Sequence, residues 1–213
     1  MKYIIANWKA HKTLGETKTW VSDFLLEVHD LKETIVIIAP PYPLIIPTYE
    51  LIKNQNNIFV ASQDISKFDT GSYTGEVPAQ TIKDVAKYAI IGHSERRENF
   101  KEDNETLAQK AKKAIENSIQ PIFCVRSVGD PIPMGIKLVA YEPVSAIGTG
   151  YNEPIEKVLD VKKNLNLDKN IRFIYGGSVN PSNFKTYLDS PKIDGLLIGS
   201  ASQDPKEFSK MLS

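Results

Sequence analysis

The chain has 213 residues, and its apolar (41%) and charged (24%) fractions are those of a globular protein with one substantial core. Its 26 basic residues balance 26 acidic ones, so net charge gives no indication of a nucleic-acid or acidic membrane partner. The single cysteine, Cys124, excludes an internal disulfide. The N-terminal apolar run is too short for a signal peptide, and no run approaches the ~20 residues of a membrane span. We therefore expect a cytoplasmic protein.

Eight apolar runs of strand length recur along the chain. Several are continuously apolar, which is typical of parallel strands buried on both faces. The runs lie at 3–7, 34–40, 57–63, 88–93, 121–125, 137–142, 171–177 and 194–200.

Most segments between these runs have the spacing of amphipathic helices. The segment 103–118 predicts a helix with Asp103 as its N-cap. A second helix is predicted to begin at Asn152 or Glu153, followed by proline in the first turn, and a third at Asn180. Alternating strands and helices favour right-handed parallel crossovers.

Eight such units predict an α/β fold, a closed (β/α)₈ barrel that forms one domain over residues 1–213. A doubly wound open sheet is the alternative. The first strand lacks the G-x-G-x-x-G turn of a dinucleotide site, which weakens that alternative.

One connection is too short for a full unit. Between Val125 and Lys137 the chain reads "RSVGDPIPMGI". A crossover usually needs a dozen or more residues, and Pro131 and Pro133 prevent a regular helix. We therefore expect the helix between strands 5 and 6 to be reduced or absent.

Polar residues fall at the carboxyl ends of the predicted strands, where barrels of this kind place their sites. Asn7 and Lys9 end the first strand and share one side of it, His93 ends the fourth and Glu142 the sixth. Each residue alone has a structural interpretation: a solvated lysine, a hydrogen-bonded histidine or a helix-capping glutamate. Closure of the barrel would bring all four to one rim, which favours a functional interpretation. Cys124 is expected to be a small core residue.

Five motifs together resemble the triosephosphate isomerase family, in the order of that family and along the whole chain except the shortened connection. The pair "GHSERR" and "AYEPV" is the most specific of them. The motifs are "ANWK" at 6–9, "YTGEV" at 73–77, "IIGHSERRENF" at 90–100, "AYEPVSAIGTG" at 140–150 and "YGGSVNP" at 175–181.

The resemblance implies a TIM barrel that interconverts dihydroxyacetone phosphate and glyceraldehyde 3-phosphate, an aldose–ketose isomerase of glycolysis and gluconeogenesis with no cofactor and no metal. It implies Glu142 as the base, His93 as a neutral electrophile, Lys9 as a positive charge beside the oxyanion, and Asn7 as a group that orients a substrate oxygen.

The resemblance also implies a phosphate site and a lid. Backbone N–H groups would hold the phosphate, and Leu197 with lid residue Ile147 would exclude water from Glu142. Glu95 and Tyr175 would support the site. The phosphate residues would be Gly148, Ser178, Gly199 and Ser200, and the lid residues Pro143, Val144, Ser145, Ala146, Ile147, Gly148, Thr149 and Gly150.

Three departures from the family pattern concern the lid and the phosphate turn. The family usually has tryptophan at the position of Ser145, Gly-Glu at Arg126 and Ser127, and a second glycine at Ser200. We expect altered lid kinetics from the first two. Ser200 would weaken phosphate binding if its φ had to be positive.

The family is typically dimeric, so the resemblance implies a homodimer through the "GSYTGE" loop, with Thr74 at its tip. A higher oligomer is a lesser alternative, because Val139 and Tyr141 should face the place of the missing helix. Either the proline-rich connection or another subunit would cover them.

Two other functions remain open from the sequence. Another barrel enzyme acting on a sugar phosphate, such as an epimerase, would share the phosphate turns but not the "GHSERR" and "YEPV" pair. A barrel that has lost catalysis and serves as a binding protein would have no need to keep Asn7, Lys9, His93 and Glu142 together.

Overall fold

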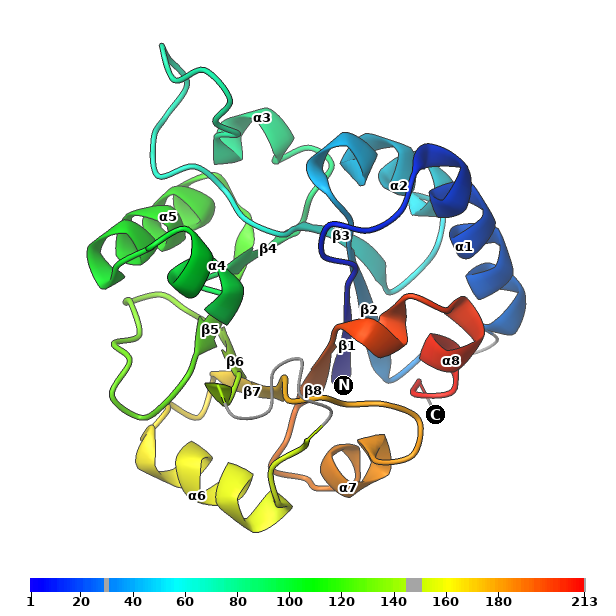
Figure 1. Ribbon diagram of the computed structural model, residues 1–213, viewed down its shortest axis with the longest axis vertical. Coiled ribbons are helices and arrows are strands. Elements are labelled where there is room, and N and C mark those ends of the chain that lie inside the picture. The colour runs from blue at the N-terminus through cyan, green and yellow to red at the C-terminus, as the bar shows by residue number, and fades with distance from the viewer. Residues whose placement is uncertain (29–30, 145–150, 213) are drawn as a thin grey trace.

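A computed structural model of the chain describes residues 1–28, 31–144 and 151–212, and these form a closed eight-stranded parallel barrel (Figure 1). Neighbouring strands follow chain order, and β8 pairs with β1 to close the ring. The predicted barrel is confirmed and the open sheet was wrong. The strands are β1 (Lys2–Asn7), β2 (Thr34–Ala39), β3 (Ile58–Ser62), β4 (Tyr88–Ile91), β5 (Gln120–Val125), β6 (Leu138–Tyr141), β7 (Arg172–Tyr175) and β8 (Gly195–Ile198).

Helices surround the barrel on its outside (Figure 1). Within the ranges that the structure describes, no helix is both long and apolar enough to cross a membrane. The α-helices are α1 (Leu14–Glu27), α2 (Ile45–Ile52), α3 (Ala79–Ile82), α4 (Ser94–Asn99), α5 (Asn104–Glu116), α6 (Ile155–Asn164), α7 (Phe184–Leu188) and α8 (Pro205–Ser209), and the 3₁₀ turns are η1 (Tyr42–Leu44) and η3 (Ser200–Ser202).

One of the three predicted helix starts is confirmed. The side chain of Asp103 accepts a hydrogen bond of 2.8 Å from the N–H of Thr106, which caps α5 as its sequence indicates. Helix α6 begins at Ile155, with Pro154 in the cap position and no side-chain cap. The prediction of Asn152 or Glu153 as its cap was wrong, because both residues bind tyrosine hydroxyls instead.

The third predicted start was four residues early. Helix α7 begins at Phe184. The side-chain oxygen of Asn180 accepts a hydrogen bond of 2.8 Å from the N–H of Ser182, so this asparagine forms a turn rather than a cap. Asparagine followed by proline is compatible with both structures, and the local sequence does not separate them.

Side chains of the strands alternate between two apolar layers. Ile5, Ile37, Ile122 and Ile174 fill the inside of the barrel, while their neighbours along each strand pack outward against the helices. Cys124 belongs to the inner layer and is fully buried, as expected of a core residue. Burial raises the pKa of its thiol, and the nearby carboxylate of Glu142 adds to the effect.

The connection between β5 and β6 contains no helix, as predicted. It covers the outer face of these strands itself. Ile136 is 4% exposed and belongs to the outer core together with Val139 and Tyr141, which are 0% and 4% exposed, and Ile132 packs against the same core. The sequence left two possibilities for what covers Val139 and Tyr141, the connection or another subunit, and the structure shows that the connection covers them.

Asp130 holds the first half of this connection in place. Its carboxylate accepts hydrogen bonds from the backbone N–H of Arg126 (2.8 Å) and from the guanidinium of the same residue (3.0 and 3.2 Å). Burial alone would raise the pKa of Asp130, but the Arg126 bonds and the charge of Arg97 hold it below its usual value. Arg126, one of the departures from the family pattern, therefore closes a compact turn.

Replacing Ile136 by alanine tests whether the connection substitutes for the missing helix. We expect Ile136→Ala to lower the free energy of unfolding by about 2–3 kcal/mol, because it removes buried methyl and methylene groups from the outer core. The matched control is Met134→Ala, since Met134 is 97% exposed two residues away, and it should cost less than about 0.5 kcal/mol. Urea unfolding of both variants gives the two values, and equal losses would contradict the packing described.

Candidate active site

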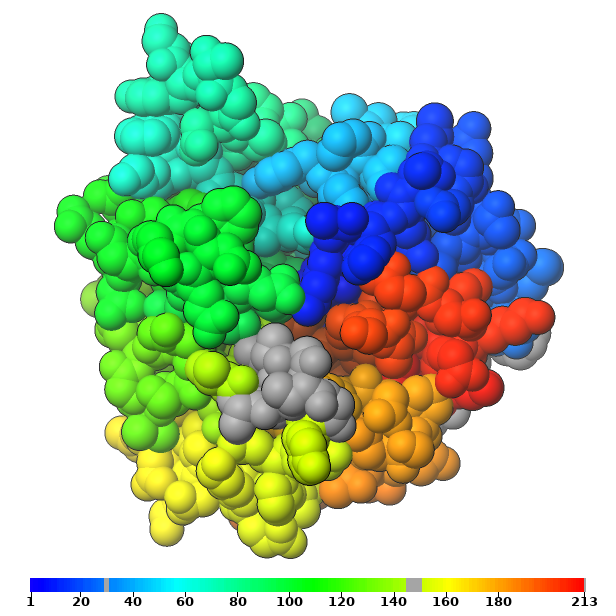
Figure 2. All heavy atoms as spheres, in the orientation of Figure 1, coloured from blue at the N-terminus to red at the C-terminus, as the bar shows by residue number. Residues whose placement is uncertain are grey.

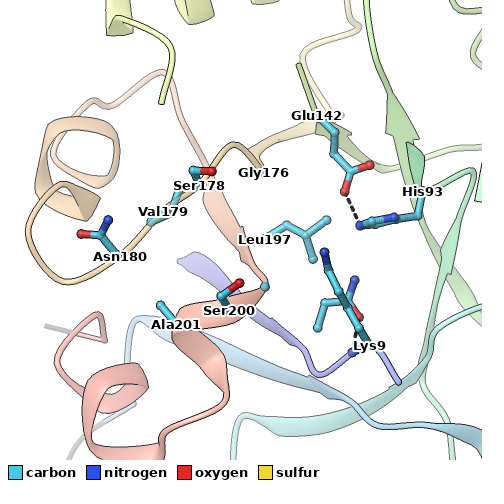
Figure 3. A pocket seen from close by; sticks show the side chains of 12 residues that line it. Lys9, His93, Glu142, Gly176, Ser178, Val179, Asn180, Leu197, Ser200 and Ala201 are labelled. Atoms are coloured by element: carbon cyan, nitrogen blue, oxygen red, sulfur yellow. Dashed lines mark hydrogen bonds and ion pairs between the residues drawn. The ribbon is translucent and has the colours of Figure 1, made fainter. Parts of the chain in front are cut away.

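The carboxyl ends of the strands surround a cavity of about 200 Å³. In Figure 3 the side chains of Lys9, His93 and Glu142 converge on one space, with Leu197 beside them. The four strand-end residues singled out from the sequence therefore share one pocket. Its lining consists of Asn7, Lys9, His93, Glu142, Gly176, Ser178, Val179, Asn180, Leu197, Gly199, Ser200 and Ala201.

Glu142 follows β6 and is 1% exposed. One carboxylate oxygen lies 3.1 Å from Nε2 of His93, and the other accepts a hydrogen bond of 3.1 Å from the backbone N–H of Ser94. Its own N–H donates to the carbonyl of Val125 on β5 (2.8 Å), which continues the barrel ladder by one residue. A buried carboxylate needs such partners, and these fix it at the end of the strand.

His93 is the N-cap residue of α4. Its Nδ1 accepts a hydrogen bond of 3.3 Å from the N–H of Glu95. In the tautomer whose Nδ1 accepts this bond, the ring proton lies on Nε2, which is 3.1 Å from the carboxylate of Glu142. The ring can therefore donate a hydrogen bond into the pocket.

Lys9 reaches the pocket from an unusual backbone conformation. Its φ is +53°, in the left-handed region that non-glycine residues rarely occupy. The Asn7 side chain accepts a hydrogen bond from the Lys9 N–H (3.1 Å), and Gln63 donates to the Lys9 carbonyl (2.8 Å). The Lys9 amine lies 2.5 Å from the carboxylate of Glu95. These contacts hold the amine beside the cavity and offset the backbone strain.

Gly176 lies close to both Glu142 and Leu197 of β8. A Cβ at Gly176 would lie 3.2 Å from Cγ of Glu142 and 3.4 Å from Cβ of Leu197. Leu197 is 5% exposed and lines the cavity next to the carboxylate. Leu197 and Glu142 line the same cavity, and the exclusion of water from Glu142 by Leu197 stays a prediction.

Two turns at the other side of the cavity present backbone groups. Ser178 has a φ of +48°, and Ser200 opens the 3₁₀ turn η3 directly after Gly199. The first N–H groups of such a turn have no partner inside it. Ser200 is not among the residues with positive φ, so serine at this position does not strain the backbone, and the predicted condition for weaker phosphate binding is not met.

Part of the predicted lid lies outside the described residues. These are Ser145, Ala146, Ile147, Gly148, Thr149 and Gly150. Pro143 is buried and Val144 is exposed. The predictions made for the other six residues, including the phosphate contact of Gly148, stay predictions.

Tyr175 lies outside the cavity. It is fully buried on the outer face of β7, and its hydroxyl accepts a hydrogen bond of 2.9 Å from the N–H of Glu153. Sequence reasoning missed the lining residues Gly176, Val179, Asn180 and Ala201, and interpreted Asn180 only as a helix start. The glycine pair after β7 was the available signal for Gly176, whereas apolar Val179 and Ala201 carry none.

Arg97 joins the ends of β4 and β5 beneath the site. Its buried guanidinium donates to the carbonyls of Gly92 (2.9 Å) and Cys124 (3.0 Å). Among the described residues, no group of three or more His, Cys, Asp or Glu side chains could hold a metal ion. The described residues with ionisable side chains that line the cavity are Lys9, His93 and Glu142.

Comparisons with known proteins agree with this geometry. The model of the triosephosphate isomerase family matches residues 2–131 and 134–213, interrupted only within the shortened connection. A triosephosphate isomerase of Mesomycoplasma hyopneumoniae strain 232 is 37% identical over 99% of this chain and 98% of its own length. The triosephosphate isomerases of Thermus thermophilus and Dictyoglomus turgidum are each 33% identical, over 98% and 97% of this chain and 96% of their own lengths. These matches also decide against the epimerase alternative: the chain belongs to the triosephosphate isomerase family.

Proposed function

We propose that the pocket of Asn7, Lys9, His93 and Glu142 is the place where this chain carries out the reaction of its family. The enzyme interconverts dihydroxyacetone phosphate and D-glyceraldehyde 3-phosphate, a step of glycolysis and gluconeogenesis. The cytoplasm is its proposed location, because that is where these pathways run. The observation that carries the proposal is the approach of Nε2 of His93 to the buried carboxylate of Glu142, at 3.1 Å, in a cavity that Asn7 and Lys9 also line.

Glu142 is proposed as the base that moves a proton between the two carbons of the substrate. A carboxylate is a stronger base when water is excluded. Glu142 is 1% exposed and lines the cavity in which the substrate is proposed to bind. The proton that it removes from one carbon returns to the neighbouring carbon, and a hydroxyl proton passes between the two substrate oxygens next to Nε2 of His93, so the base and the imidazole are restored in each turnover.

His93 and Lys9 are proposed to stabilise the oxygens of the enediolate intermediate. The imidazole donates from Nε2, and the Lys9 amine brings a positive charge to the same cavity. Preorganised donors of this kind are worth about 2.7–4 kcal/mol each in the transition state. Asn7 lies beside them and holds the backbone of Lys9, while Glu95 holds its amine.

The substrate phosphate is proposed to lie between the turns of Ser178 and Gly199–Ser200. The side chains there are small, and the turn η3 presents its first N–H groups to the cavity. Backbone N–H groups bind a phosphate without a charged side chain. Lys9 lies next to this turn, since a Cβ at Gly199 would be 3.4 Å from its Cε.

The variant Glu142→Gln tests the proposed base. The amide keeps the size of the side chain but cannot take a proton from carbon, so kcat should fall by a factor of about 10²–10⁴. A coupled assay on glyceraldehyde 3-phosphate measures it. Glu98→Gln is the matched control, because Glu98 is an exposed carboxylate of α4 outside the cavity, and it should keep full activity.

Equal activity of Glu142→Gln and the parent protein would overturn the assignment of the base. Absence of activity in the parent protein would instead favour the alternative of a barrel that binds without catalysing.

A second measurement concerns the tautomer of His93. Nitrogen-15 NMR of the histidine rings near neutral pH should show an unprotonated Nδ1 and a protonated Nε2, because Nδ1 accepts from Glu95. The chain has three histidines, and the spectrum of His93→Gln assigns the signal. A ring with protons on both nitrogens would contradict the proposed role as a neutral donor.

We further propose a homodimer formed through the loop between β3 and α3. This loop stands out from the rest of the molecule (Figures 1 and 2). Its shape is held by Phe68 and Tyr73, whose rings stack at 4.1 Å, and by the bond between Ser66 and Glu76 (2.5 Å). Thr74 at the tip is exposed. A rigid exposed loop suits insertion into a partner, because little further conformational entropy is lost on binding.

Light scattering at micromolar concentration should give twice the chain mass of 23.8 kDa. Thr74→Arg should reduce it to a monomer, because a charged side chain at the tip would have to be buried in the partner. Met134→Arg on the exposed connection is the control and should leave the mass unchanged. A monomeric parent protein would exclude the dimer, and dissociation by Met134→Arg alone would favour an interface at the connection.

A further inference from the structure

Three tyrosine hydroxyls converge on residue 153, just before α6. The hydroxyl of Tyr141 on β6 donates to the carboxylate of Glu153 at 2.8 Å. The hydroxyl of Tyr175 on β7 accepts from the N–H of Glu153 at 2.9 Å, and that of Tyr187 on α7 donates to its carbonyl at 2.6 Å. Residue 153 thus connects two strands and two helices.

Two of these three bonds do not require glutamate. Tyr175 and Tyr187 bind backbone groups, which any residue with the same conformation supplies. The side-chain carboxylate itself accepts the bond from Tyr141 and forms an ion pair with Lys157. Glu153 is 6% exposed, and burying a carboxylate costs several kcal/mol unless partners compensate. We therefore ask what the carboxylate of Glu153 does that a smaller, uncharged side chain would not do.

Tyr141 directly precedes Glu142, and the two side chains lie on opposite sides of the strand. The ring of Tyr141 lies in the outer core, near Phe173 with a centroid distance of 6.4 Å. Glu142 faces the cavity. Burial and the Glu153 carboxylate raise the pKa of Tyr141, so its hydroxyl keeps the proton that it donates. Successive side chains of a strand point to opposite faces. A rotation of the backbone that turned Tyr141 would therefore also turn Glu142.

We propose that Glu153 is a positioning residue: through its hydrogen bond to Tyr141 it fixes the rotation of the end of β6 and thereby the direction of the Glu142 carboxylate. This inference rests on the proposed role of Glu142 as the base. Reactions between positioned groups are sensitive to displacements of about 1 Å, which cost up to about a hundredfold in rate. The effect of losing the bond should therefore fall on kcat.

Tyr141→Phe removes the hydroxyl and keeps the ring. We expect kcat to fall about tenfold and KM to change by less than about twofold, because the phosphate turns are untouched. Glu153→Ala should have the same effect. Glu153→Gln keeps an oxygen that accepts the bond and should restore most of kcat. The double variant Tyr141→Phe/Glu153→Ala should be no slower than Glu153→Ala alone, because both changes break one interaction.

Lys157→Ala is the matched control. Lys157 binds the other oxygen of the same carboxylate, and its side chain is 60% exposed on α6. It should leave kcat unchanged, even if it lowers the melting temperature slightly. Circular dichroism and thermal unfolding of each variant show whether it is folded, and where Tyr141→Phe fails to fold, the comparison of Glu153→Gln with Glu153→Ala decides.

An unchanged kcat in Tyr141→Phe and Glu153→Ala would overturn the inference. So would a double variant in which the two losses of kcat multiply. A change in KM and melting temperature alone would also overturn it. The Glu142→Gln variant separates this failure from that of the proposed function. If Glu142→Gln is inactive while Tyr141→Phe has normal kcat, only the positioning role fails. If Glu142→Gln is active, the proposed base itself fails.

Discussion

The closure of β8 onto β1 is the constraint on which the rest of the structure depends. The two strands pair in parallel from Tyr3 opposite Gly195 to Ala6 opposite Ile198. A Cβ at position 195 would lie 2.0 Å from the carbonyl oxygen of Tyr3, so the approach requires glycine. Closure removes both sheet edges and brings the ends of β1, β4, β6, β7 and β8 around one cavity. Without it, Lys9 and Glu142 would belong to different ends of an open sheet.

Local sequence signals predicted the fold where local interactions decide the structure. The continuous apolar runs gave all eight strands, and Asp103 gave the start of α5, because its cap bond spans only three residues. The starts of α6 and α7 were misplaced for a different reason. Glu153 is engaged by tyrosines that are 12, 22 and 34 residues away, and no periodicity within the segment reports such contacts.

The candidate site was likewise predicted from the sequence only in part. Strand alternation and closure together predict that Asn7, Lys9, His93 and Glu142 meet, and they line one cavity. The sequence does not predict the bond from the Ser94 N–H to Glu142, which depends on how α4 leaves β4. It also does not predict that Tyr175 faces away from the cavity. Motifs identify residue types near a site, whereas backbone donors and side-chain directions follow from tertiary packing.

Strand β6 differs from the other strands in what holds it from outside. The connection before it has no helix, and Ile132 and Ile136 supply the apolar cover in place of one. Two isoleucines of a loop resist rotation of a strand less than a packed helix does, because fewer side chains interlock with it. A directional bond compensates for this, since a hydrogen bond fixes orientation where apolar packing alone does not. The bond between Tyr141 and Glu153 acts at the carboxyl end of β6, in the outer core that Ile136 and Ile132 also help to fill. The short connection and the buried glutamate are therefore parts of one arrangement, in which the strand that carries the carboxylate is held by a loop and a hydrogen bond.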